Sequence, residues 1–489
     1  MDKKALKETT IIGLVYRFAE RISAQLVSTI ISIILARLLT PEDYGVISLV
    51  TVLITIGNVF VDSGFGAALV QKKNPDKLDY STVLCASLII SFGLYIIAFS
   101  IAPFVARYYE NDTLTPIFRI MALRLPIAGM NTVQNAYISK HFMFKKFFWA
   151  TLSGTLGSGI LGIVLAYCGY GSWALVAQYI SSVTINTIAL ALIINLAPSF
   201  KFSWARFKSM LSFGINILIS GLATAIYEEA RSLIIAKMYS VVDLSYYTKG
   251  KQFPGLLANN VSTTIRNVMF PVLSVYQDDK KGMKKAVRRS IRVCSYIIFP
   301  MLIGFAAISK TFVLVVLTEK WLPIIPYTYI FCALYIFKPL KNINQSSLKA
   351  LGRGGLYLAI NIFEKTFGIV LIIFTMRLGV IYLAFSAVIV YSVTAILEMT
   401  ANGVVISYNF LEQIKDFLPH LLMSLVMGGI VYYIPLQNIN PVLALCIQIC
   451  SGILSYLGLS ILVRSETLRY LSSTIKTVLS KRSRNGNTR

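Results

Sequence analysis

The chain of 489 residues is 56% hydrophobic and 14% charged, with a mean hydropathy of +0.70 and a net charge of +25. This composition excludes large soluble domains and is typical of proteins with many membrane-spanning helices. The basic residues cluster at the edges of apolar runs, without a nucleic-acid-binding motif, so we expect no nucleic-acid partner. The six cysteines and two histidines lack metal-ligand spacing, and the first apolar run has no small-residue cleavage site. We therefore expect no metal, no cofactor and no removable signal peptide.

Apolar runs long enough to cross ~30 Å of hydrocarbon at ~1.5 Å per residue recur along the whole chain. The eighth run is amphipathic, because it contains Lys249, Lys251 and Arg266. The sequence predicts an all-α polytopic membrane protein with about 14 transmembrane helices, at residues 11–38, 46–67, 81–106, 114–138, 147–168, 173–194, 211–236, 244–275, 293–317, 324–348, 356–376, 381–400, 417–435 and 441–463.

The Lys and Arg residues of the loops predict an orientation. If the chain starts in the cytoplasm, the cytoplasmic loops and tails contain 29 of the 46 basic residues, and the opposite loops contain six. Because Lys and Arg accumulate on the cytoplasmic side, we expect both termini to be cytoplasmic. The most basic segments are DDKKGMKKAVRRSIR (278–292) and SKRSRNGNTR (480–489). Attraction to anionic lipid explains both; capture of an anionic substrate at the cytoplasmic mouth is the alternative.

Eleven basic residues but only six acidic ones remain at membrane depth. Each such charge costs at least ~2.5–3.5 kcal/mol when it faces lipid, so these groups should face a bundle interior or a wet cavity. Helix-to-helix hydrogen bonding is the alternative explanation for the uncharged polar residues that accompany them. We expect a cationic lumen whose candidate substrate-binding residues are Arg17, Arg21, Arg124, Arg231, Lys249, Lys251, Lys338 and Lys341.

Carboxylates at membrane depth are candidate proton or sodium sites. Glu364 lies in the middle of the eleventh run, next to Lys365. Coupling to an ion gradient and an intramembrane salt bridge are both open explanations for it. The candidate ion-coupling residues are Glu364, Asp62, Glu398 and Glu228.

An internal repeat predicts the domain organisation. IILARLLTPEDYGVISLV (33–50) recurs as LIIAKMYSVVDLSYYTKG (233–250), and two weaker echoes pair Pro126 with Pro339 and Gly169 with Gly379. Each copy contains six spans, an even number, so both copies enter the membrane in the same direction, as in transporters built from parallel repeats. We expect an N-terminal lobe at 1–194, a cytoplasmic linker at 195–210, a C-terminal lobe at 211–402, two further helices at 403–463 and a basic cytoplasmic tail at 464–489.

Three segments carry a family resemblance: LARLLTPEDYGVISLV (35–50), DSGFGAALVQKK (62–73) and FPVLSVYQDDKKGMKKAVRRSIRVCSYIIFP (270–300). They resemble the polysaccharide-transporter branch of the multidrug, oligosaccharidyl-lipid and polysaccharide flippase superfamily, in particular Wzx-type and colanic or teichuronic acid exporters. The resemblance implies two six-helix lobes around a cationic lumen. It also implies that undecaprenyl-pyrophosphate-linked oligosaccharides move from the inner to the outer leaflet of a bacterial inner membrane by alternating access. Other polysaccharide assembly proteins are candidate partners.

Two other function classes make different demands on the sequence. A multidrug exporter of the same superfamily should have an acidic or apolar lumen for cationic drugs, whereas the basic excess at membrane depth predicts the opposite. A membrane polysaccharide polymerase or ligase should carry its active site on a long periplasmic loop, and the loops on that side are short. We therefore expect a transporter and not an enzyme.

Overall fold

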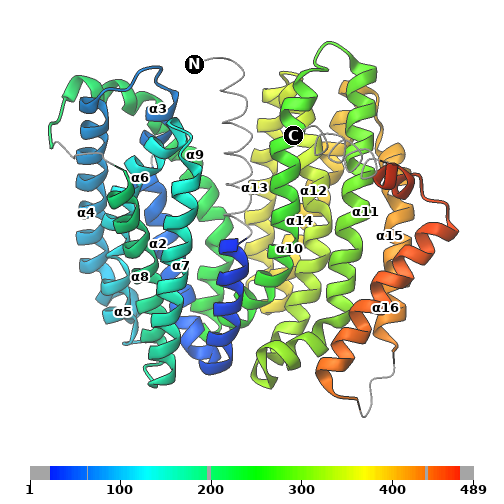
Figure 1. Cartoon of the computed structure of the whole chain (residues 1–489), viewed down its shortest axis with the longest axis horizontal. Coiled ribbons are helices and arrows are strands. Elements are labelled where there is room, and N and C mark those ends of the chain that lie inside the picture. Colours follow the sequence, from blue (N-terminus) through cyan, green and yellow to red (C-terminus); the bar gives the residue numbers. More distant parts are fainter. Residues whose placement is uncertain (1–22, 63, 195–199, 435–438, 474–489) are drawn as a thin grey trace, which may run out of the picture. The chain divides into compact units, whose positions relative to one another are not determined.

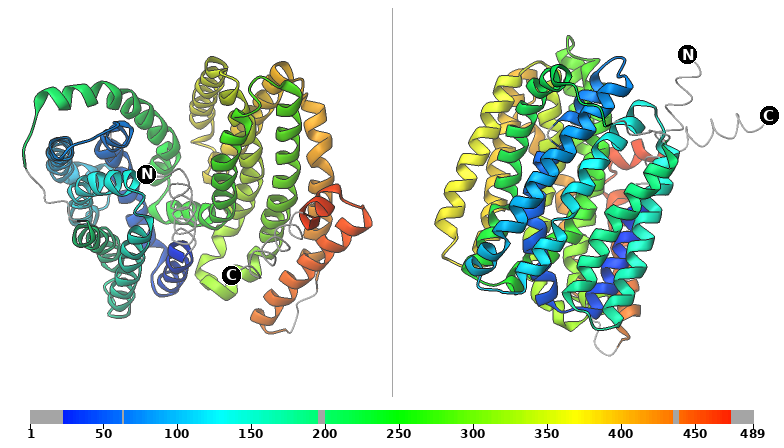
Figure 2. Two further views of the ribbon diagram at one scale, coloured as in Figure 1. Left: turned by 45° about the horizontal axis from the view of Figure 1, so that its top comes forward. Right: turned by 90° about the vertical axis from the view of Figure 1, so that its left-hand side faces the viewer.

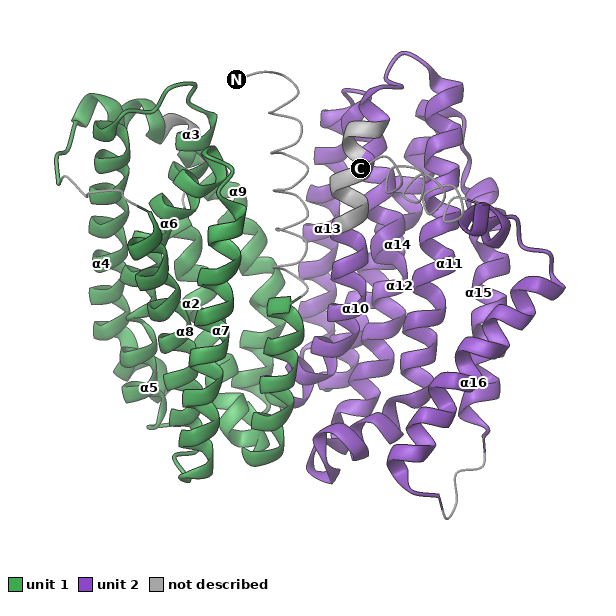
Figure 3. Cartoon of the chain, in the orientation of Figure 1, with its two compact units in different colours: residues 1–245 green, residues 246–489 purple. Residues whose placement is uncertain are grey.

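The computed structural model describes residues 23–62, 64–194, 200–434 and 439–473, and these residues form helices and connecting turns without a β-strand. The chain divides into two compact units, residues 1–245 and 246–489 (Figure 3). Ten helices in the described part are long and apolar enough to cross a membrane. The protein is therefore a multi-pass membrane protein.

In the first unit, long helices run side by side as a bundle (Figures 1 and 2). Short helices complete it where the chain turns. The helices are Ser23–Leu38, α2 (Pro41–Asp62), α3 (Phe65–Gln71), α4 (Lys77–Tyr108), α5 (Leu114–Met121), α6 (Arg124–Lys140), α7 (Phe144–Tyr167), α8 (Ser172–Ile193) and α9 (Trp204–Met238).

The second unit is also a helical bundle, and it receives the chain through α10 (Figure 1). A π-helical turn and a 3₁₀ turn join α11 to α12. The elements are α10 (Val241–Ser274), α11 (Lys280–Phe312), the π-helix Val313–Leu317, the 3₁₀-helix Glu319–Ile324, α12 (Ile325–Ala350), α13 (Gly354–Thr375), α14 (Val380–Ile406), α15 (Phe410–Tyr432) and α16 (Pro441–Leu462).

Each predicted span has a helical counterpart in the described residues, and two of the runs are divided: the second between α2 and α3, and the fourth between α5 and α6. The fourth run forms two helices, because the chain turns at Ala122 and Leu123 before α6 begins. Pro126 occupies the first turn of α6, where its missing N–H group breaks no helical hydrogen bond. The all-α polytopic fold class is confirmed, although α9 and α10 are too polar to count among the ten most apolar helices.

The internal repeat has a structural counterpart at the start of α2 and α10. The Thr40 hydroxyl donates to Asp43 Oδ2 at 2.7 Å, and the Ser240 hydroxyl donates to Asp243 Oδ2 at 2.6 Å. In return, each hydroxyl accepts a hydrogen bond from the aspartate backbone N–H, at 3.2 and 3.0 Å. The residues paired by the 200-residue offset therefore cap equivalent helices in the same way.

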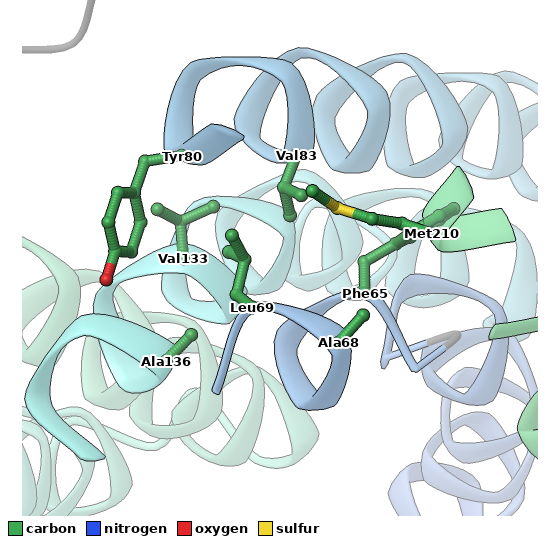
Figure 4. Packing of buried hydrophobic residues seen from close by; sticks show 8 residues of the cluster. All are labelled: Phe65, Ala68, Leu69, Tyr80, Val83, Val133, Ala136 and Met210. Carbon is green, nitrogen blue, oxygen red and sulfur yellow. The ribbon is translucent and has the colours of Figure 1, made fainter. Parts of the chain in front are cut away.

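The short helix α3 anchors the basic loop after α2 to the bundle. Phe65, Ala68 and Leu69 pack on α4 and α6, and Met210 of α9 closes the cluster (Figure 4). The loop beyond α3 ends in a capping box, in which Asp76 and Asp79 each accept the other's backbone N–H. Arg206 of α9 binds Asp76, and this contact lowers the pKa of Asp76 to about 2.

The helix α9 packs on α2, α3 and α4, so it belongs to the first unit and not to the second. The lobe boundary that the basic linker predicts, at 195–210, stays a prediction, and by contacts the chain divides into two compact units after Ser245. Close packing holds α9 in the first unit, because Gly221 leaves room for Val59 and Gly64 meets the backbone of Gly214. Residues 200–203 form the turn that precedes α9, and residues 204–210 are the first turns of that helix.

Candidate functional site

A buried ion pair joins three helices of the second unit. Lys341 Nζ of α12 lies 2.9 Å from Glu364 Oε2 of α13 and donates to the Thr394 hydroxyl of α14 at 3.0 Å. The ring of Tyr391, one turn before Thr394, lies 4.4 Å from the ammonium group. Lys341 is only 5% exposed, and its charge is balanced by Glu364. This is the salt-bridge arrangement that the sequence left open for Glu364.

Glu398 lies on the same face of α14 as Thr394, one turn further along. Its Oε1 accepts a hydrogen bond from Gln345 Nε2 at 2.7 Å. Its Oε2 is buried and has no hydrogen-bond partner among the described residues. A buried carboxylate oxygen without a partner is costly as an anion, and a bound proton or a small cation removes that cost.

Amide side chains extend this polar region towards α15. Asn344 Nδ2 donates to Gln413 Oε1 at 3.1 Å, and Gln413 Nε2 donates to the carbonyl of Tyr408 at 3.0 Å. Asn402 Nδ2 donates to the carbonyl of Asn344 at 3.2 Å. Sequence reasoning missed Gln413 and Thr394, because single polar residues in apolar helices carry no signal of their partners.

The remaining predicted cations of the second unit lie beside polar or aromatic groups. Lys338 Nζ donates to Asn259 Oδ1 of α10 at 2.6 Å. Lys249 is buried, and its ammonium group lies 5.7 Å from the centre of the Trp321 ring. Lys251 is half-buried on the same helix. Lys338 and Lys341, three residues apart on α12, are thus held by different partners.

In the first unit, Arg124 stands at the start of α6 with its guanidinium 5.1 Å from the centre of the Tyr179 ring. Its Nε is buried and has no hydrogen-bond partner in the described part of the chain. No carboxylate of the described residues forms an ion pair with it either. Arg231 of α9 is 6% exposed and lies 5.7 Å from the Tyr227 ring.

A polar cavity of about 340 Å³ has Tyr179, the aromatic neighbour of Arg124, in its wall, although Arg124 itself does not line it. Three helices line it: Ser23–Leu38, α7 and α8. Its walls are hydroxyl and amide groups with no ionised side chain, and its lining is Ala24, Gln25, Ser28, Thr155, Ser158, Gln178, Tyr179 and Ser182. Amide and hydroxyl groups of this kind can donate to and accept from a polyhydroxylated ligand.

The second unit carries an apolar groove of about 410 Å³ between α10, α11, α15 and α16. Its walls come from aliphatic, Met, Phe and Pro side chains, among them Leu257, Met301 and Ile453. Gln448 and Tyr456 are its polar members. The groove therefore suits a hydrocarbon chain better than a charged ligand.

The other predicted site residues divide into two groups. Arg17 and Arg21 lie outside the residues that the structure describes. Asp62, at the C-terminal end of α2, and Glu228 of α9 are both exposed. The structure thus brings together Lys341 and Glu364, with Glu398 nearby on α14. Asp62 and Glu228 belong to the first unit, whereas the Lys341–Glu364 pair belongs to the second.

Comparison with known proteins identifies the family. A family model described as "Polysaccharide biosynthesis protein" matches residues 34–326. The succinoglycan biosynthesis transport protein ExoT of Rhizobium meliloti (strain 1021) is 24% identical over 59% of this chain and 58% of its own length, so the match spans less than two thirds of that relative. The teichuronic acid biosynthesis protein TuaB of Bacillus subtilis (strain 168) is 23% identical over 84% of this chain and 86% of its own.

The fold has a solved counterpart in the lipid II flippase MurJ in an inward closed conformation. The TM-score is 0.74 at 17% identity, and the alignment covers 93% of this chain and 99% of MurJ. This likeness confirms the expected flippase fold. Together with the family match over more than half of the sequence, it shows that the chain belongs to the polysaccharide biosynthesis protein family.

Proposed function

We propose that this protein is a flippase that carries undecaprenyl-pyrophosphate-linked oligosaccharide units from the inner to the outer leaflet of a bacterial inner membrane. Both termini are cytoplasmic in this proposal, and the units feed surface polysaccharide assembly by other proteins. The family match, the transport role in the name of ExoT and the flippase fold support this function.

The observation that carries the proposal is the Arg124 site. An arginine without a carboxylate partner in the described residues lies against Tyr179, and Tyr179 lines an uncharged cavity whose other walls carry hydroxyl and amide groups. A guanidinium binds phosphate oxygens through paired N–H donors, and the cavity offers partners for sugar hydroxyls. A pyrophosphate-linked sugar presents both chemistries next to each other.

The other predicted cations have graded roles in this proposal. Arg17, Arg21, Arg231, Lys249, Lys251 and Lys338 add positive potential along the path of the pyrophosphate. Lys341 contributes less, because Glu364 balances its charge. The apolar groove of the second unit suits the isoprenoid tail, which can remain in contact with lipid during transfer.

Ion coupling in this proposal depends on Glu398. Its unpartnered Oε2 can take up a proton or a small cation, whereas Glu364 already holds Lys341. Because α12 and α14 both contribute to this region, a change in charge at Glu398 alters the contact between them through Gln345.

Deletion of the gene in the source organism tests the function. The proposal predicts loss of surface polysaccharide together with accumulation of lipid-linked units on the inner leaflet. Accumulation on the outer leaflet would instead indicate a polymerase or ligase. Loss of drug resistance with intact polysaccharide would indicate a multidrug exporter.

A further inference from the structure

The N-terminal half of α11 carries four cations on one helical face. Arg288 and Arg289 each lie three or four residues from both Lys285 and Arg292, so the four side chains are neighbours on the helix surface. The opposite face is buried through Met283, Val287, Ile291 and Cys294. Like charges at these spacings repel each other, so this face lowers the stability of the helix unless anions balance its charge.

Two carboxylates compensate part of this charge. Asp416 of α15 binds two of the cations: Arg292 Nη2 lies 2.6 Å from its Oδ1, and Arg288 Nε lies 2.8 Å from its Oδ2. Arg292 Nη1 also lies 2.7 Å from Glu466 Oε2. Among the described residues, neither Lys285 nor Arg289 forms an ion pair. Four cations thus face two carboxylates, which leaves an excess of about two positive charges.

These cations line a cavity of about 340 Å³ whose other wall is the segment after α16. Tyr470 and Thr467 of that segment line the cavity, and the guanidinium of Arg289 lies 3.6 Å from the centre of the Tyr470 ring. Stacking on the ring leaves the N–H groups at the edge of the guanidinium available to a ligand. The volume far exceeds the ~30 Å³ that one water occupies, so it admits a headgroup.

The wall formed by the C-terminal segment is anchored to the bundle. Thr467 is buried, and its hydroxyl lies 3.2 Å from His420 Nε2. Leu468 and Leu471 pack against the core formed by Tyr296, Met423, Met427 and Tyr456. The cavity is therefore a built feature of the second unit and not a gap beside a loose tail.

The position of the cavity favours a lipid as its occupant. Helix α11 continues from the basic face into one of the ten apolar spans, and the segment Glu466–Tyr470 follows directly after the span α16. The cavity thus lies where two apolar helices leave the hydrocarbon, at the depth of phosphate headgroups. Soluble phosphate has the same charge chemistry but no acyl chains to place against these helices.

We propose that this cavity binds the phosphate of an anionic glycerophospholipid, with Lys285 and Arg289 as its principal ligands. The bound phosphate supplies the missing negative charge and holds the C-terminal segment against α11. This lipid site is separate from the Arg124 region and does not depend on the proposed transport function.

Lipid titration of the purified full chain tests the proposal. Native mass spectrometry measures retention of phosphatidylglycerol and of phosphatidylcholine by the wild type, Arg289→Gln and Lys285→Gln. Neither substitution removes an ion-pair partner from Asp416 or Glu466, so both variants should fold. Lys281→Gln is the matched control, because Lys281 is exposed on the first turn of α11 and does not line the cavity.

We expect selective retention of phosphatidylglycerol by the wild type and the control, and an about tenfold weaker affinity in each cavity variant, as for the loss of one charge-assisted hydrogen bond. Arg289→Lys should recover part of the affinity. The proposed site would be overturned if the wild type retained the two lipids equally. It would also be overturned if Lys281→Gln lost as much affinity for phosphatidylglycerol as the cavity variants do. Saturation by glycerol phosphate at the same concentration would overturn the assignment to a lipid.

Discussion

At the scale of residues, the basic side chains of the membrane helices differ in what holds them. Arg119 lies over the Phe99 ring at 4.2 Å, and its Nε donates to the Phe99 carbonyl at 3.2 Å. Arg124, five residues later, has an aromatic neighbour but an unpartnered Nε in the described structure. Two arginines at similar positions in the chain are therefore suited to a structural and a ligand-binding role, respectively.

Replacement of Arg124 tests this difference. Arg124→Ala should reduce export per folded molecule by at least about tenfold, through loss of a charge-assisted contact. Its free energy of unfolding should fall by no more than ~1 kcal/mol, because only the contact with Tyr179 is lost. Arg119→Ala is the control, with reduced thermal stability and normal export per folded molecule. Normal export by Arg124→Ala would contradict the assignment.

Glu364 and Glu398 should respond differently to the same isosteric change. Glu364→Gln leaves the buried Lys341 without its counter-charge and should lower the free energy of unfolding by roughly 3–5 kcal/mol. The double change Lys341→Met with Glu364→Met should recover most of that stability.

Glu398→Gln should have a free energy of unfolding within ~1 kcal/mol of the wild-type value. Its transport should no longer depend on the proton or sodium gradient. Thermal denaturation and gradient-driven transport in vesicles measure these effects, and an unchanged ion dependence in Glu398→Gln would exclude it as the coupling carboxylate.

At the scale of elements, the helices themselves were predictable, because a run of apolar residues must satisfy its backbone in the bilayer as a helix. The offset between Thr40 and Ser240 also located two equivalent helix starts, and Gly169 and Gly379 both adopt positive φ before α8 and α14. Helix partners were not predictable. The pairing of α9 with α2 and the contact of Lys341 with Glu364 depend on packing between faces, and a sequence specifies a face but not what covers it.

The equivalent caps should be equivalent in energy. Thr40→Ala and Ser240→Ala each remove a side-chain acceptor for the first turn, at a cost of about 1 kcal/mol in the free energy of unfolding. Ser100→Ala is a suitable control, because the Ser100 hydroxyl donates only to the Ile96 carbonyl of its own helix. Thermal denaturation in detergent measures the three changes. If the free energy of unfolding of either cap variant fell no further than that of the Ser100→Ala control, the two repeats would not be structurally equivalent at these caps.

At the scale of the whole molecule, the distribution of basic residues predicts which ends of the helices face the cytoplasm. Single cysteines at Asn74 and Lys281 should resist an impermeant thiol reagent in intact cells, whereas one at Asp112 should react. All three positions are exposed. The background must lack the native Cys168, Cys446 and Cys450, which are exposed free thiols. Labelling at Lys281 from outside would reverse the orientation.

The transport function needs a direct measurement on the whole chain. The protein is reconstituted into vesicles loaded with an undecaprenyl-pyrophosphate-linked oligosaccharide, and a glycosidase added outside reports the fraction of glycan that reaches the outer leaflet. The account predicts rapid exposure of the glycan with wild-type protein and slow exposure with Arg124→Ala at equal amounts of folded protein. Exposure no faster than in protein-free vesicles, while the same preparation exports cationic drugs, would contradict it.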